Sequence, residues 1–204
     1  TVDSATQPHF DGQPITLGRV ETIADTDGGN DAIVTLGGYD IVLGGNGGDT
    51  ITVSHIVDTA DSLSDATELG NVRDDNIVLG DNGFIDYDDD QLLATGNETN
   101  ADDIDLIEST TLMTHGGVDT INAGDGDDII IGGREGDTIN ARDGDNLVIG
   151  DSGRITAATV DSATQPHFDG QPITLGRVET IADTDGGNDA IVTLGGYDIV
   201  LGGN

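Results

Sequence analysis

The chain has 204 residues, 40 of them acidic and 6 basic, and its formal net charge of −34 excludes nucleic acid as an expected partner because nothing would neutralise the phosphates. It contains no cysteine, so neither a disulfide framework nor a thiolate metal site can form. The apolar runs are too short to span a bilayer, and we expect no membrane insertion.

A long repeat organises the chain. Residues 1–46 recur without a change at 159–204, which gives a period of 158 residues. We interpret the sequence as a segment of a longer tandem array, in which each unit contacts mainly its neighbours. A deliberate duplication would give the same identity between the two copies. Neighbouring repeats of the same chain are therefore the expected partners, and self-association into fibres is left open.

The first predicted unit is a coil of short strands over residues 26–85, which follows a connector at 1–25 that would end the preceding unit. Asp31, Asp40 and Asp49 stand nine residues apart, and an aliphatic residue follows each of them two places later. A helix would need a period near 3.6 and fewer glycines. Six turn residues followed by three strand residues therefore predict short parallel strands wound into a coil.

The nine-residue count weakens late in the first coil. It reaches Asp58, where the next residues suit a strand poorly, and it returns at Asn76. Residues 76–85 resemble 146–155 at an offset of 70, whereas the aspartate series of the two coils begin 88 residues apart. Because the difference of 18 is two nonapeptides, we expect the first coil to be longer than the second by one full turn.

The second coil is predicted over residues 116–155. Its turns carry the same nine-residue series: Asp119, Asp128, Asp137 and Asn146. Glycines crowd the positions before each of these residues, and Ile or Val follows two places after each.

Connectors separate the coils. They are predicted at 86–115 and at 156–183, the latter identical in part to the start of the chain, and residues 184–204 begin the next coil. Each connector holds one extended segment, at 104–108 and 173–181, and lacks the glycines of the coil turns. We expect these segments to leave the coil as strands and to pack back on it.

Two nine-residue segments carry the pattern most fully, 44–52 (GGNGGDTIT) and 123–131 (AGDGDDIII). They resemble the RTX, or hemolysin-type, nonapeptide family with its pattern GGxGxDxUx. The resemblance implies an all-β fold, a calcium-binding parallel β-roll or β-solenoid whose tandem coils are joined by connector strands. It also implies several Ca²⁺ ions, each between turns one full coil apart on the same edge. Glycine turns would offer backbone carbonyls and the aspartates would offer carboxylates, the oxygen ligands that calcium prefers.

Carried over by position, the resemblance implies ligand pairs one coil apart: Asp31 with Asp49, Asp119 with Asp137, and Asp128 with Asn146. Asp40 and Asp58 would pair less securely. The full set of candidate metal residues adds two from the next period and two turn glycines: Asp189, Asp198, Gly47 and Gly126.

Some turns depart from the family pattern. Glu135 replaces a motif glycine, Asn146 replaces an aspartate, and the turn before Asp40 lacks the first glycine pair, so sites there are expected to be weaker or empty. The alternative is that these residues only cap turns, as Asp and Asn often do. Stacked carboxylates at the spacing of neighbouring strands would then repel one another with no cation between them.

Consecutive nonapeptides of a coil alternate between two sheets, so the strand triplets sort into two faces. One face reads AIV, TIT, TIN and TIN, and the other reads IVL, IVL, III and LVI. The central residue of each triplet points inward and its neighbours point outward. On the second face all outward residues are large aliphatics: Ile129, Ile131, Leu147 and Ile149 are examples. We expect connector strands or the partner coil to cover this face, since an apolar stripe of this size normally meets something.

The function expected is structural and non-catalytic: a repeating segment of a large secreted or cell-surface protein, such as an adhesin stalk or filament, that folds on calcium outside the cell. Two alternatives stay open, a ligand-binding adhesin module whose Thr/Asn face holds a glycan or ice, and the calcium-binding tail of a secreted enzyme. The string Gly150-Asp151-Ser152-Gly153 looks like a serine-protease nucleophile, but its counterpart at 80–83 has no hydroxyl. The four histidines lack zinc spacing.

Overall fold

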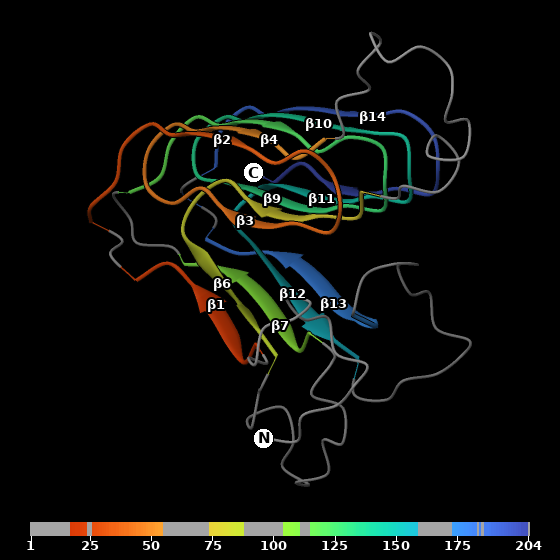
Figure 1. The fold of residues 1–204 in the computed structure, drawn as a ribbon. Coiled ribbons are helices and arrows are strands. Elements are labelled where there is room, and N and C mark those ends of the chain that lie inside the picture. Colours follow the sequence, from red (N-terminus) through yellow and green to blue (C-terminus); the bar gives the residue numbers. More distant parts are fainter. Residues whose placement is uncertain are drawn as a thin grey trace, which may run out of the picture.

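The computed structural model describes residues 17–23, 26–54, 74–87, 104–110, 115–158, 173–182, 184 and 186–203. Every regular element in these ranges is a β-strand, so the predicted all-β class is confirmed. Figure 1 shows three layers: two stacked parallel sheets and a third sheet packed against one of them. No helix among the described residues is long and apolar enough to cross a membrane.

The outermost parallel sheet is termed the threonine sheet. It is ordered β14-β10-β8-β4-β2. Its strands are β2 (Ala32–Val34), β4 (Thr50–Thr52), β8 (Thr120–Asn122), β10 (Thr138–Arg142) and β14 (Ala190–Thr193).

The middle layer, also parallel, is termed the aliphatic sheet and is ordered β15-β11-β9-β5-β3. Its strands are β3 (Ile41–Leu43), β5 (Ile77–Leu79), β9 (Ile129–Gly133), β11 (Leu147–Asp151) and β15 (Ile199–Leu201). From β2 through β3 to β4, and from β8 to β9, turns of six residues carry the chain from one parallel sheet to the other. The predicted sorting of the triplets into two faces is confirmed.

The third layer is antiparallel and is termed the cover sheet, ordered β1-β6-β7-β12-β13. Its strands are β1 (Arg19–Glu21), β6 (Gly83–Asp86), β7 (Leu106–Ser109), β12 (Gly153–Ala157) and β13 (Leu175–Thr180). β7 and β13 lie where the sequence predicts connector strands.

The two predicted coils form one uninterrupted stack. β4 pairs with β8, with Thr50 opposite Thr120, and β5 pairs with β9, with Ile77 opposite Ile129. The chain therefore leaves the stack after β5, builds part of the cover sheet, and resumes the stack at β8 in register.

The space between the parallel sheets is filled by the central residues of the triplets. Six of them are completely buried there: Ile51, Val78, Ile121, Ile130, Ile139 and Val148. Each such side chain stabilises the stack by about 1.5–3 kcal/mol relative to an exposed one.

The outward aliphatics of the aliphatic sheet are buried as well. Ile129, Ile131, Leu147 and Ile149 are at most 1% exposed. They belong to a second core cluster with Ile107 and other residues of the cover sheet. The prediction that connector strands cover this face is therefore confirmed.

The ends of the coils differ from the prediction. Residues 83–85 and 153–155, expected to close the two coils, belong to β6 and β12 of the cover sheet. The cause is local: a Cβ on Gly83 would lie 2.3 Å from the Leu79 side chain, so glycine lets the chain turn back closely over its own preceding strand.

The expected extra turn of the first coil is wrong. β3 pairs directly with β5, and β4 pairs directly with β8, so the sheets have no place for a further strand between them. Asp58, within the interval 55–73, lies outside the described residues. The predicted connectors 1–25, 86–115 and 156–183 are described only in part.

Candidate functional site

The acidic residues of the nonapeptides gather along the two edges of the stack. On the first edge, turns lead into the threonine sheet, and on the second edge, turns lead into the aliphatic sheet. The residue directly before each strand forms a column on the first edge: Asp31, Asp49, Asp119, Asp137 and Asp189. The matching column on the second edge is Asp40, Asn76, Asp128, Asn146 and Asp198. Every aspartate and asparagine of the predicted metal set lies in one of these columns.

Hydrogen bonds connect each column from coil to coil. The backbone N–H of Asp49 donates to Oδ1 of Asp119 at 2.6 Å, and that of Asp119 donates to Oδ1 of Asp137 at 2.8 Å. The predicted pairs Asp31 with Asp49, Asp119 with Asp137, and Asp128 with Asn146 are confirmed as neighbours in the columns. Because the stack is continuous, Asp49 is also the neighbour of Asp119, a pair that the sequence did not predict.

The second carboxylate oxygen of these residues is left without a donor. Among the described residues, the buried side-chain oxygens with no hydrogen-bond partner include six aspartate Oδ2 atoms, all from the two columns: those of Asp40, Asp49, Asp119, Asp128, Asp137 and Asp189. Buried polar atoms are normally satisfied, and an unsatisfied carboxylate oxygen is costly. Among the described residues, the columns therefore present buried oxygens that are available to a proton or a cation.

On the first edge this oxygen lies beside a backbone carbonyl. A Cβ placed on Gly132 would lie 2.5 Å from Oδ2 of Asp137 and 2.2 Å from the carbonyl oxygen of Gly150. The same arrangement of a glycine, an Asp Oδ2 and a glycine carbonyl recurs along the edge at Gly44, Gly80 and Gly150. Two acceptor oxygens brought together with no donor between them suit a hard cation. Only glycine leaves this space open.

Burial affects the protonation of the columns. It raises the pKa of Asp119 to about 7, that of Asp128 to about 8 and that of Asp137 to about 9. Backbone hydrogen bonds partly oppose the shift, and neighbouring carboxylates add to it. The pKa values of Asp49 and Asp189 are also raised by burial. Without a cation, the charged form of these acids is thus disfavoured.

No three acidic or histidine side chains converge on one point in the described part of the chain. A site made of side chains alone is therefore absent there. Any cation at these turns needs carbonyl oxygens as ligands beside the carboxylate, which is the combination that the first edge offers.

The second edge alternates between aspartate and asparagine, and the asparagine amides supply donors. Nδ2 of Asn146 donates to the carbonyl of Gly144 and to Oδ1 of Asp198, each at 3.1 Å. Nδ2 of Asn76 likewise donates to Oδ1 of Asp128, at 3.1 Å. Asn146, predicted as a metal residue, thus acts here as a donor through its own amide, while Oδ2 of its neighbour Asp128 has no hydrogen-bond partner.

The two predicted turn glycines have a stacking role. Gly47 has a φ of 127°, and a Cβ there would lie 2.5 Å from the carbonyl oxygen of Gly29 in the preceding coil. A Cβ on Gly126 would lie 2.5 Å from the carbonyl oxygen of Asp74. Both glycines let one turn pack directly on another.

The position that follows Asp40 on the second edge differs from the prediction. Asn76, and not Asp58, accepts the hydrogen bond from the Asp40 N–H, at 3.1 Å. The physical reason is that aliphatic strand residues follow Asn76, whereas Ala60 and Asp61 follow Asp58.

Sequence reasoning missed two buried aspartates where the chain leaves the stack, Asp81 and Asp151. The Asp81 carboxylate accepts hydrogen bonds from the N–H groups of Gly117, at 3.0 Å, and Arg134. Asp151 accepts one from Gly187 at 3.0 Å. Each aspartate lies where the chain leaves the stack, and it accepts its hydrogen bonds from a segment that follows after the chain has returned. Burial raises the pKa of Asp81 to about 8. The sequence did carry a signal. In both related segments, 76–85 and 146–155, an aspartate stands where residues 44–45 have the second of two glycines.

A further ladder on the second edge was also missed. Asp145 N–H donates to Oδ1 of Asp127, and Asp127 N–H donates to Oδ1 of Asp75, each at 2.8 Å. These residues directly precede those of the column, so the turn carries two acidic rows side by side.

Comparison with known proteins gives no match: the chain is not significantly similar to any protein-family profile, curated protein or solved structure that was searched.

Proposed function

We propose that the chain is a non-catalytic structural repeat of a large extracellular protein, such as an adhesin stalk or surface filament. Its two parallel sheets form a calcium-loaded β-roll of the kind found in the RTX family, which its nonapeptides resemble. The observation that carries this proposal is the column of buried Asp Oδ2 atoms, each without a donor and each beside a glycine carbonyl on the first edge.

The first-edge aspartates and glycine carbonyls would hold the ions. Asp137 Oδ2 with the carbonyl of Gly150, and Asp119 Oδ2 with the carbonyl of Gly132, are representative ligand sets. Bound Ca²⁺ supplies positive charge to carboxylates that otherwise repel and are poorly solvated. The free energy of metal binding then becomes free energy of folding.

This coupling accounts for secretion and for localisation outside the cell. At low cytosolic calcium the chain, with its net charge of −34, stays unfolded and ready for export. Extracellular calcium at about millimolar concentration saturates even weak sites of the extracellular class.

The surroundings of the protease-like string support a non-catalytic role. Ser152 is only 1% exposed, and the neighbouring Asp151 accepts a hydrogen bond from Gly187. A substrate cannot reach a hydroxyl buried at the junction of stack and cover sheet.

A second candidate function is ligand binding on the threonine sheet, for which the ladder of outward Thr and Asn side chains is the specific observation. Thr50, Thr120 and Thr138 are paired in register across three strands, as are Thr52, Asn122 and Asn140. Such regular rows could bind a glycan or ice. A glycan array and an ice-affinity assay test this role separately from calcium-dependent folding.

The decisive experiment is a calcium titration followed by far-UV circular dichroism, with magnesium as control and a chelator for reversal. We expect a disordered spectrum that becomes β on addition of calcium alone. A β spectrum that is unchanged by chelator would overturn the proposal, because the aspartates would then be turn caps only.

A further inference from the structure

Residues 17–45 and 175–203 are two copies of one sequence, yet they bind their neighbours through opposite edges. In the cover sheet, Thr22 N–H of the first copy donates to the carbonyl of Gly83 at 3.0 Å. In the second copy it is Ile181 N–H, the equivalent of Ile23, that donates, to the carbonyl of Ser152 at 2.9 Å. Successive N–H groups of a strand point to alternate edges. β1 therefore uses one edge to bind β6, and β13, its copy, uses the other edge to bind β12.

The aliphatic sheet repeats this relationship. Gly44 N–H, at the end of β3, donates to the carbonyl of Leu79 at 2.9 Å. In β15, the copy of β3, Ile199 N–H donates to the carbonyl of Asn146 at 2.7 Å. Ile199 corresponds to Ile41, which stands three residues before Gly44. The N–H groups of these two positions therefore point to opposite edges of the strand.

The threonine sheet does the same. Thr35 N–H, after β2, donates to the carbonyl of Thr52 at 2.9 Å. In β14, the copy of β2, Ala190 N–H donates to the carbonyl of Asp137 at 2.7 Å, and Ala190 corresponds to Ala32. In all three sheets, one copy therefore shows the contact within a period, and the other copy shows the contact between two periods.

We propose that the outward edges of β13, β14 and β15 form a docking surface for a further copy of the 158-residue period, so that periods joined in tandem build one continuous three-sheet fibre. This rests on the proposed structural role and goes beyond it, since a stalk could equally consist of separately folded units. The occupant is another copy of this sequence, because the same sequence binds a neighbour through one edge in the first copy and through the other edge in the second copy.

The three sheets advance in step, which a continuous fibre requires. In each sheet three strands lie between a strand of the first copy and its equivalent in the second, so the two are four strand steps apart: β1 to β13, β2 to β14 and β3 to β15. Equal steps allow every sheet to continue without mismatch. Four strand spacings correspond to a rise of about 19 Å for each period.

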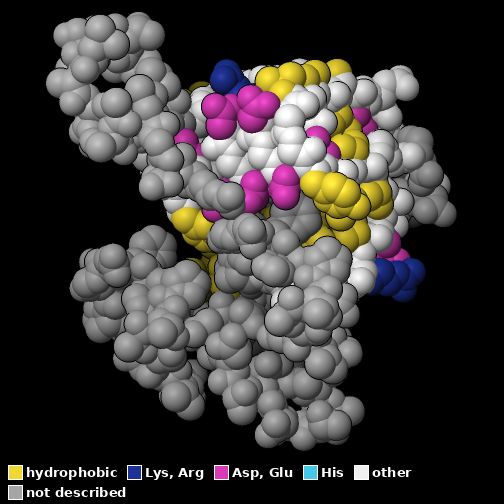
Figure 2. Space-filling model, turned by 90° about the vertical axis from the view of Figure 1, so that its right-hand side faces the viewer, with side chains coloured by type: hydrophobic (Ala, Val, Ile, Leu, Met, Phe, Trp, Pro, Cys, Tyr) yellow, Lys and Arg dark blue, Asp and Glu magenta, His cyan; other side chains and the backbone are white. Residues whose placement is uncertain are grey.

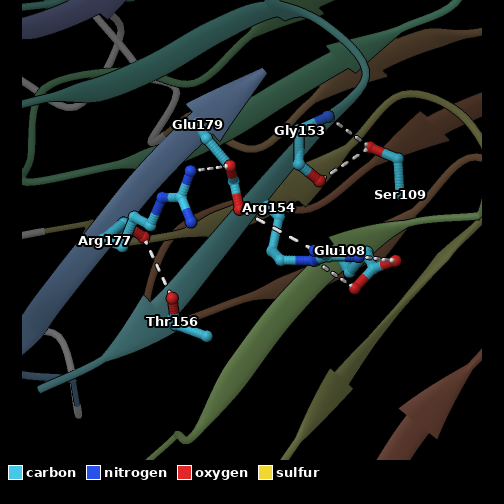
Figure 3. A network of polar contacts seen from close by, with 7 residues as sticks. All are labelled: Glu108, Ser109, Gly153, Arg154, Thr156, Arg177 and Glu179. Atoms are coloured by element: carbon cyan, nitrogen blue, oxygen red, sulfur yellow. Dashed lines mark hydrogen bonds and ion pairs between the residues drawn. The ribbon is translucent and has the colours of Figure 1, made fainter. Parts of the chain in front are cut away.

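In the cover sheet, Arg19 and its copy Arg177 have different surroundings, because each lies at a different edge of the sheet. Arg19 Nη1 donates to Asp86 at 2.8 Å and its guanidinium lies 3.8 Å from the centre of the Phe84 ring, whereas its copy Arg177 has a 73% exposed side chain. Across the period boundary, Arg154 contacts Glu179 at 3.7 Å, and within its own period Arg154 forms two hydrogen bonds with Glu108 (Figure 3). A following copy of β6 would bring its Asp and Phe to Arg177.

The stack end shows the same incompleteness. Val42 is 7% exposed, but its copy Val200 is 45% exposed, and Tyr197 is 73% exposed where Tyr39 is 37% exposed. Figure 2 shows hydrophobic side chains in groups beside acidic ones on one face of the molecule. A further coil stacked on β14 and β15 would cover Val200 as β5 covers Val42.

The proposed calcium column also crosses the period boundary. Asp137 N–H donates to Oδ1 of Asp189, and a Cβ on Gly150 would lie 2.2 Å from Oδ2 of Asp189 and 2.9 Å from the carbonyl of Gly202. The boundary is thus built like the coil contacts inside a period.

The length of extended chains tests the proposal. Chains that carry one, two or three further copies of residues 47–204 after Asn204 are measured by small-angle X-ray scattering in saturating calcium. A continuous fibre predicts that the maximum dimension increases by about 19 Å for each added period. Separately folded units of 158 residues predict about 39 Å or more for each. An increment near the larger value, with an intact β spectrum, overturns the fibre. Loss of the calcium-induced spectrum would instead overturn the proposed function.

A pair of identical substitutions in the two copies tests the edges directly. In the 204-residue chain, Ala190→Pro removes the N–H that donates to Asp137, whereas Ala32→Pro alters the same sequence on the outward edge of β2, where proline is tolerated. We expect hydrogen-exchange protection of residues 190–201 to be lost in A190P and retained in A32P. In a chain extended by a copy of residues 1–158 before Thr1, A32P should become as damaging as A190P. Equal effects of the two prolines in the 204-residue chain would exclude the proposed use of opposite edges.

Discussion

The backbone N–H of Asp137 donates a 2.9 Å hydrogen bond to Oδ1 of Asp189, a residue 52 positions further along the chain. Asp189 is the copy of Asp31 in the next period. Oδ2 of Asp189 is buried without a partner, whereas Asp31 is exposed at the start of the stack. One sequence position is therefore seen in two environments, and this gives a matched pair for experiments on the metal sites.

Asp189→Asn should remove a calcium site at the period boundary, whereas Asp31→Asn should leave the number of bound ions unchanged. The carboxylate of Asp189 is the one held beside the carbonyl of Gly202. Isothermal titration calorimetry of the two variants and the parent chain gives the stoichiometry. Equal losses in D189N and D31N would contradict the assignment of sites to contacts between coils.

Asn146→Asp should increase the calcium stoichiometry, because it replaces an amide that donates to Gly144 and Asp198 by a second carboxylate. The metal-free chain should in turn become less stable, since the new charge lies among buried acids. Asn122→Asp, on the outer face of the threonine sheet, adds the same charge away from the turns and serves as control. A rise in stoichiometry in both variants would indicate non-specific binding.

Acid should stabilise the metal-free stack. Burial raises the pKa values of Asp119, Asp128 and Asp137 from 3.8 to about 7, 8 and 9, so the folded chain holds protons that the unfolded chain has released. Stability is then greatest below the unfolded pKa and falls as pH rises from about 4 toward the folded values. Calcium should largely abolish this dependence, because the cation takes the place of the protons.

Circular dichroism in chelator at about pH 4, 6 and 8 measures how much of the metal-free chain is folded, and urea unfolding in calcium at the same pH values gives the second profile. A metal-free profile that rises with pH would be incompatible with the raised pKa values.

Ile131→Ala should lower the free energy of unfolding by about 2–5 kcal/mol, as expected for a large-to-small change in a closed core. Ile131 is 1% exposed between the aliphatic and cover sheets. Val34→Ala, at a side chain that is 61% exposed, should change stability by less than about 0.5 kcal/mol. Urea titrations in saturating calcium make the comparison, and similar costs at the two positions would mean that the cover sheet does not seal the aliphatic face.

The sequence was sufficient to predict the stack because its local signals agree. The nine-residue spacing of Asp119, Asp128 and Asp137 fixed the strands, and the outward Ile129 and Ile131 fixed which face the connectors cover. These predictions depend only on turn chemistry and on strand alternation, both of which act over a few residues.

The contacts that join distant segments were not predictable in this way. The pairing of Asp49 with Asp119 spans 70 residues, and nothing near either aspartate indicates that the stack resumes in register after an excursion. Asp81 was missed for the same reason, because its partners Gly117 and Arg134 follow only after that excursion. In addition, the count of nine extended the first coil to Asp58, where spacing continued but strand residues did not.

The strands lie across the direction in which the sheets grow, and this decides how the protein responds to pulling. A load along the stack acts on the hydrogen bonds between coils one after another, so the outermost coil detaches first. The 18 residues between Asp31 and Asp49 occupy one strand spacing of about 4.8 Å along this direction but reach about 60 Å when drawn straight. A detached coil of 18 residues thus lengthens the tether about twelve-fold over its folded contribution, and the steps of 70 residues from Asp49 to Asp119 and of 52 residues from Asp137 to Asp189 release still more chain. A stalk built this way would yield stepwise and take up a sudden pull before its covalent chain is strained.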